Sequence, residues 1–176
     1  MIKYLMAVFV ALLLFQSCES ATESYFEKNE FMPLKVGNKW YWNHWIKDTT
    51  SVDEIWEVVG WQKVNCHYYF KVARYNGPGD TTISYLYFRI DNNTLFRKWP
   101  GRDETILADF SLNLNEEAYW SEDLFVTKKD ESTIVFQKTI GLDLPQLEFK
   151  KGIGLTRDEN FGVFHYRHKL VGYEIK

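Results

Sequence analysis

The chain has 176 residues, of which 21 are lysine or arginine and 24 are aspartate or glutamate, and its formal net charge is −3 at pH 7. The basic residues are scattered without a run, which argues against nucleic acid as a ligand. The chain also has 7 Trp, 11 Tyr and 13 Phe. These large apolar side chains are sufficient for the core of one domain.

The N-terminus has the organisation of a bacterial export signal. Lys3 precedes an apolar run over residues 4–15, which is too short to cross a bilayer as a helix. The next residues complete the segment 14–18, Leu-Phe-Gln-Ser-Cys, which resembles a lipobox. The resemblance implies cleavage before Cys18 and attachment of diacylglycerol to its sulfur, which would anchor the protein to a membrane. The alternative is an ordinary secretory signal that leaves Cys18 as a free thiol.

This organisation predicts three parts. Residues 1–17 form a lipoprotein signal peptide, and because Lys3 is its only charged residue, its removal changes the net charge from −3 to −4. Residues 18–30 are mostly polar and form a lipidated tether, and residues 31–176 form a single β-rich domain. We expect the protein at the outer membrane or cell surface, held by lipid on Cys18, with the periplasmic face of a membrane as the alternative.

The domain has the composition of an all-β protein, since it is rich in Tyr, Phe, Trp, Val, Ile and Thr and is interrupted by turn residues every eight to twelve positions. We predict an antiparallel meander of about ten strands that forms a half-open barrel or a sandwich. Asn76-Gly77-Pro78-Gly79-Asp80 should turn one hairpin. No segment has a convincing helical period, and residues 111–118 come nearest to one. The predicted strands are 39–46, 53–59, 67–75, 82–90, 94–99, 104–110, 124–128, 133–140, 147–155 and 161–175.

Alternation within the strands predicts which side chains face the core. Trp40, Trp42 and His44 share one face of the first strand, and both tryptophans should lie in one packed layer. In the last strand the core-facing residues include His168 and Leu170, after which the apolar positions change parity. A β-bulge near 170–171 would explain that change.

Two segments resemble parts of uncharacterised envelope lipoproteins of Gram-negative bacteria. Residues 33–42, Pro-Leu-Lys-Val-Gly-Asn-Lys-Trp-Tyr-Trp, resemble their opening PLxxGNxWxY motif, and residues 150–155, Lys-Lys-Gly-Ile-Gly-Leu, resemble their closing KGIGL strand. The resemblance implies an antiparallel β-rich lipoprotein with no assigned activity. It supplies no catalytic residues.

The sequence favours a non-catalytic protein over an enzyme. It has no Gly-x-Ser-x-Gly elbow, phosphate loop or dinucleotide fingerprint. His165 and His168 are three apart on a predicted strand and should therefore point to opposite faces, so we expect no metal site. We expect no cofactor either. The second cysteine, Cys66, is interpreted as a core thiol.

Binding is the leading functional hypothesis, because tryptophan can serve as a stacking surface for ligands as well as a core residue. Trp61 follows a glycine in a predicted turn and Trp99 precedes a proline, so both should be exposed at strand ends. Arg167 lies on the solvent side of the last strand. We therefore expect Trp61, Trp99 and Arg167 to contact a ligand or partner on an aromatic-rich concave face. The candidate partners are a glycan, a lipid or an envelope protein.

Two other functions remain open at this point. One is a lipid carrier or lipoprotein-receptor-like half-barrel, which predicts a deep apolar cavity without polar anchors. The other, less favoured, is a glycan-acting enzyme, which predicts convergent carboxylates or histidines with shifted pKa values. Sugar binding without catalysis predicts exposed tryptophans beside Asn, Asp or Arg.

Overall fold

The computed structural model describes residues 28–44, 51–140, 145–160 and 166–176. These residues form eleven antiparallel strands in one open sheet, ordered β6-β5-β4-β3-β2-β1-β11-β10-β9-β8-β7. No helix occurs among them, and so none that is long and apolar enough to cross a membrane. The strands are β1 (Lys39–Asn43), β2 (Glu54–Val64), β3 (His67–Tyr75), β4 (Ile83–Asp91), β5 (Thr94–Lys98), β6 (Glu104–Asp109), β7 (Leu124–Lys129), β8 (Thr133–Lys138), β9 (Pro145–Lys150), β10 (Gly154–Asn160) and β11 (Tyr166–Glu174).

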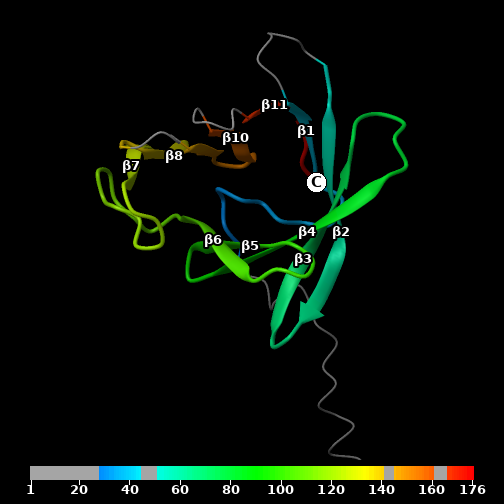
Figure 1. The fold of residues 1–176 in the computed structure, drawn as a ribbon, viewed down its shortest axis with the longest axis horizontal. Coiled ribbons are helices and arrows are strands. Elements are labelled where there is room, and N and C mark those ends of the chain that lie inside the picture. Colours follow the sequence, from blue (N-terminus) through cyan, green and yellow to red (C-terminus); the bar gives the residue numbers. More distant parts are fainter. Residues whose placement is uncertain (1–27, 45–50, 141–144, 161–165) are drawn as a thin grey trace, which may run out of the picture.

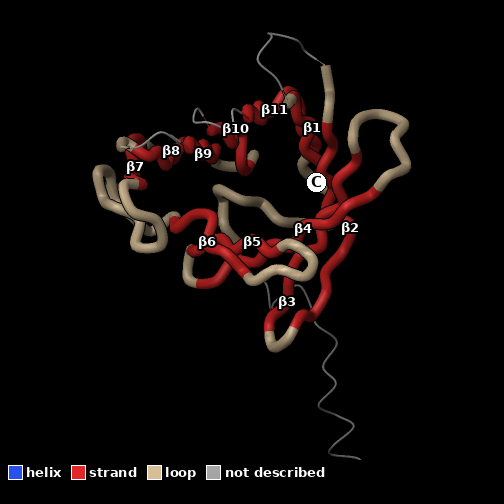
Figure 2. The backbone as a smooth tube through the Cα atoms, viewed as in Figure 1, coloured by secondary structure: helices blue, strands red, loops and turns tan. Residues whose placement is uncertain are grey.

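The sheet is strongly curved and does not close into a barrel. Figure 1 shows β7–β10 facing β4–β6 across the interior, with β1, β2 and β11 forming the bend between them. The tube view in Figure 2 shows the non-strand segment 28–38 running between these two limbs. Within that segment Phe31 stacks on Phe110 at 5.7 Å, and Met32 is buried in the core. The all-β, half-open architecture predicted from the sequence is therefore confirmed.

The two ends of the domain meet in the pairing of β1 with β11. Strands β1–β6 form one meander and β7–β11 a second, and the β1–β11 ladder joins them. Tyr41 pairs with Gly172 but Trp42 pairs with Leu170, which leaves Val171 as an extra residue. The bulge predicted near 170–171 is therefore present, and it accounts for the change in apolar parity along the last strand.

The interior of the curved sheet contains the hydrophobic core. Trp40 and Trp42 are each 1% exposed, and the rings of Trp42 and Trp56 lie 5.0 Å apart. The indole nitrogen of Trp40 donates to the carbonyl oxygen of Ile153 at 2.6 Å. Trp40 and Trp42 are therefore structural residues, as their shared face predicts.

The segments 33–42 and 150–155 contact each other in this core. Gly154 has φ +103°, and a side chain there would meet Met32 Sδ and Trp40 Nε1 at 3.3 Å. The backbone N–H of Gly152 also donates to the carbonyl of Glu30 at 2.7 Å. Glycine is required at 154 because the indole of Trp40 packs directly against the backbone.

Three local predictions were wrong. The predicted strand 147–155 is two strands, β9 and β10, because residues 151–153 form a turn in which Gly152 has φ +76°. The turn predicted at Gly60 and Trp61 is instead part of β2, which runs from Glu54 to Val64. Cys66 is exposed, because it lies with Asn65 in the tight turn between β2 and β3, where Asn65 has φ +55°. Asparagine tolerates this left-handed conformation better than most residues.

We predict that Trp42→Ala lowers the free energy of unfolding by about 3–5 kcal/mol, the range for removing a buried aromatic side chain. Urea denaturation of the purified protein would measure the loss. Trp61→Ala is the matched control, because Trp61 is 46% exposed and its removal opens no core cavity. Equal denaturation midpoints for wild type and Trp42→Ala would contradict the core assignment.

Candidate functional site

A pocket of about 390 Å³ opens at one end of the interior. Its walls come from the segment 28–38, from β2 and β3, and from the C-terminus. A volume of this size lies within the usual range for small-molecule sites. The apolar part of its lining consists of Pro33, Leu34, Val36, Trp61, Phe70 and Ile175.

A bulge in β2 places Trp61 in this pocket. The β2–β3 register shifts between Val58 and Gly60, after which Trp61 pairs with Phe70 on the interior side of the sheet. The β2–β3 hairpin continues beyond the core, so Trp61 is 46% exposed, and its ring packs edge-on against Tyr68 at 5.6 Å. Trp61 therefore lies beyond the core on the interior side of the hairpin, where it lines the pocket.

The polar lining of the pocket is mainly basic. Lys28, Lys35 and Lys176 contribute positive charge, whereas the one acidic lining residue, Glu30, pairs with Lys151 at 2.6 Å. Asn38 is fully buried and has a structural role: its amide nitrogen donates to the carbonyl of Pro33 at 2.6 Å, and its amide oxygen accepts from the backbone N–H of Lys176 at 2.9 Å. The pocket thus combines an apolar lining with several basic residues.

The structure does not bring the other two predicted ligand residues to this pocket. Trp99 follows β5 and is half-buried, with the guanidinium groups of Arg74 and Arg97 at 5.0 and 6.0 Å from its ring. Arg167 lies on β11 and donates through Nε to Glu159, whose carboxylate is buried, at 2.5 Å. Of the three, only Trp61 lines the pocket.

A second cluster lies at the opposite end of the interior, where His44, Glu54 and His168 meet. His44 follows β1, Glu54 begins β2, and His168 is on β11. The rings of His44 and His168 stack at 4.3 Å with an interplanar angle of 17°, and His44 Nε2 lies 2.5 Å from Glu54 Oε2. One candidate ligand atom from each residue lies within 4.8 Å of the other two.

The electrostatics of this cluster favour an ionised carboxylate beside an uncharged His168. Burial acts to raise the pKa of Glu54, but hydrogen bonds from His44 and Arg74 outweigh it and lower the pKa to about 2. Burial and the neighbouring His44 lower the pKa of His168. The other oxygen of Glu54 accepts from Trp56 Nε1 at 2.8 Å and from Arg74 Nε.

The sequence contained part of the signal for this cluster. Alternation places His44 on the same face as Trp40 and Trp42, and His168 on the core side of the last strand. What it does not reveal is that β1 pairs with β11, which brings residues 44 and 168 together. His165 lies outside the described residues.

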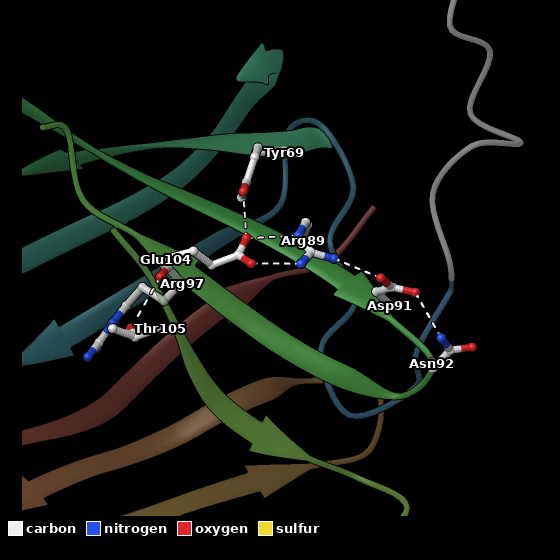
Figure 3. A network of polar contacts seen from close by, with 7 residues as sticks. All are labelled: Tyr69, Arg89, Asp91, Asn92, Arg97, Glu104 and Thr105. Atoms are coloured by element: carbon white, nitrogen blue, oxygen red, sulfur yellow. Dashed lines mark hydrogen bonds and ion pairs between the residues drawn. The ribbon is translucent and has the colours of Figure 1, made fainter. Parts of the chain in front are cut away.

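A third polar group lies on the outer face of β3–β6 (Figure 3). Arg89 donates from Nε and Nη2 to the two carboxylate oxygens of Glu104 at 2.8 and 2.7 Å, and from Nη1 to Asp91 at 3.0 Å. The Tyr69 hydroxyl donates to Glu104 at 2.5 Å. Because the guanidinium of Arg89 bonds to both carboxylates and the bonds link β3, β4 and β6, we interpret this group as a structural network.

A scan against protein-family models and searches of curated proteins and of solved structures found no match to this chain.

We predict that Glu104 contributes to the acid sensitivity of the fold. Burial acts to raise its pKa, but hydrogen bonds from Arg89 and Tyr69 lower it overall. A carboxyl with a lowered pKa in the folded state stabilises the fold above its unfolded pKa of about 4.3, and this stabilisation is lost as the pH falls through the folded value. Wild type should therefore lose more stability than Glu104→Gln between about pH 5 and pH 3.

Urea titrations at a series of pH values would test this prediction. Glu122→Gln removes one negative charge at an exposed position and serves as the control. If the free energies of unfolding of wild type and Glu104→Gln fall in parallel as the pH is lowered, the prediction is contradicted.

Proposed function

We propose that the chain is a lipid-anchored envelope lipoprotein, and that its β-domain binds, without catalysis, an amphiphile with an apolar body and an anionic end in the Trp61 pocket. The observation that carries the proposal is the composition of the pocket: six apolar side chains and three lysines line a volume of about 390 Å³. Burying a ligand's apolar body contributes about 0.8 kcal/mol per methylene group. The lysines favour an anionic head group.

The pocket supports an amphiphile better than a glycan. Sugar recognition combines an aromatic face with several directed hydrogen-bonding groups. Here the buried amide of Asn38 is already bonded to the backbone of Pro33 and Lys176, and Glu30 is paired with Lys151. Trp61 supplies the aromatic face, but the polar groups that would orient a sugar have other partners.

The position of the pocket in the chain also supports action near a bilayer. Lys28, the first described residue, lines the pocket and is ten residues after Cys18. Ten residues span at most about 33–36 Å. With lipid on Cys18, the pocket would therefore remain within that distance of the membrane surface, where amphiphiles are concentrated.

We predict that Trp61→Ala weakens binding of palmitate by about ten- to hundredfold, because the substitution removes about 1.5–3 kcal/mol of apolar contact and 1.4 kcal/mol corresponds to a factor of ten. Displacement of a fluorescent fatty acid from the purified protein would measure the affinity. Tyr119→Ala is the control, because Tyr119 is an exposed aromatic residue that does not line the pocket.

Two comparisons define the ligand class. Hexadecanol, which lacks the negative charge of palmitate, should bind to wild type more weakly than palmitate does. Lys35→Gln should reduce that difference in affinity, because Lys35 lines the pocket and its positive charge attracts the carboxylate. If the protein binds maltooligosaccharides and does not bind palmitate, a glycan ligand is favoured. No binding of any of these probes would overturn the proposal.

We predict that Cys18→Ala releases the protein from the membrane fraction of cells and removes the mass of the acyl chains. Fractionation followed by mass spectrometry of the mature chain would measure both effects. Cys66→Ala is the control, because it removes the other cysteine of the chain. A Cys18→Ala protein that remains in the membrane fraction with unchanged processing would contradict lipidation.

A further inference from the structure

We propose that His44, Glu54 and His168 form a binding site for one Zn²⁺ ion. This site is separate from the Trp61 pocket. Seven residues separate Glu54 from Trp61 along β2, which corresponds to about 23 Å in an extended strand. The inference does not depend on the proposed function.

The backbone brings the three side chains to one point from three adjacent strands. Trp42 pairs with Glu54 on one side and with Leu170 on the other, and Asn43 pairs with Lys169. His44 follows Asn43 directly, one residue beyond the end of this ladder, and its ring stacks on that of His168 at 4.3 Å. Because β1 lies between β2 and β11, the sheet holds Glu54 and His168 on either side of the end of β1, where His44 follows.

The donor set and its spacing fit zinc. Two imidazoles and one carboxylate are a recognised set of three protein ligands for Zn²⁺, with bonds of about 2.0–2.2 Å, which leave the fourth tetrahedral position for water or another ligand. The three candidate ligand atoms already lie within 4.8 Å of one another. Coordination requires the stacked rings of His44 and His168 to converge, and the partly exposed side chain of His44 has room to rotate.

The surroundings of Glu54 orient one oxygen toward the site. Trp56 and Arg74 both donate to Oε1, while Oε2 faces His44. Such outer hydrogen bonds are typical of ligating carboxylates, because they fix the side chain and leave one oxygen for the metal. Asp158 pairs with His168 across the β10–β11 ladder, so a carboxylate also neighbours the second histidine.

The test is titration of the purified full-length protein with Zn²⁺ after dialysis against EDTA, followed by calorimetry. We expect one equivalent to bind to wild type. His44→Gln and His168→Gln should each weaken binding by more than about a hundredfold, since loss of an outer partner alone costs 10- to 100-fold. His67→Gln, at an exposed histidine on β3, is the matched control and should bind as wild type.

The choice of the primary variant and experiments with other metal ions keep the test decisive. Glu54→Gln leaves Arg74 without its carboxylate and could unfold the domain, so His44→Gln, at a partly exposed side chain, is the primary variant. Co²⁺ should give the visible absorption of a four-coordinate site in wild type and not in His44→Gln, and Ca²⁺, which prefers six to eight oxygen ligands, should not compete. Absence of zinc binding by wild type, or equal affinity of wild type and His44→Gln, would overturn the proposal.

Discussion

The pairing of β1 with β11 is the constraint on which the rest of the structure depends. Each meander, β1–β6 and β7–β11, is built from pairs of strands close in sequence, whereas Lys39 pairs with Glu174 across almost the whole domain. Without this ladder the two limbs of the sheet would have no reason to face each other. The Val171 bulge adjusts its register, so that Trp42 packs inside the bend while Val171 remains exposed. Strand β2 reaches both candidate sites, since Glu54 begins it and Trp61 lies seven positions further along it.

The interior changes character along these strands. At the centre, Trp40, Trp42 and Trp56 are buried with aliphatic residues from β3–β5. Toward the β11 C-terminus the extended β2–β3 hairpin carries Trp61 past the core and leaves a largely apolar pocket that three lysines also line. Toward the other end, the positions that would continue the core hold His44, Glu54, Arg74 and His168. A buried carboxylate is costly unless its hydrogen bonds are made, and the donors around Glu54 meet that requirement. Polar groups at a position otherwise used for packing indicate a role beyond stability.

Several elements could be predicted because their signals are local. The predicted strand 67–75 has the bounds of β3. Residues 76–80 lie in the turn before β4, since Gly77 and Gly79 adopt positive φ angles without steric cost and Pro78 has a fixed φ. The faces of Trp40 and Trp42 follow from alternation. The turn at 151–153 was not predicted, because Phe149 and Leu155 both suggest one continuous strand across it. Cys66 was placed in the core because its neighbours are strand-forming, although Asn65 marked the turn.

By itself, the sequence determined the all-β class, the turns that end most strands, the buried face of the first strand and the change in apolar parity near 170–171. These depend on residues within a few positions of one another, through alternation and turn conformation. Only the tertiary structure decided that the sheet stays open and that the first strand pairs with the last. It alone showed that His44 meets His168, and that Trp61 lines a pocket while Trp99 and Arg167 lie elsewhere. Strand partners distant in sequence are chosen by packing of the whole core, and no local pattern in this chain records that choice.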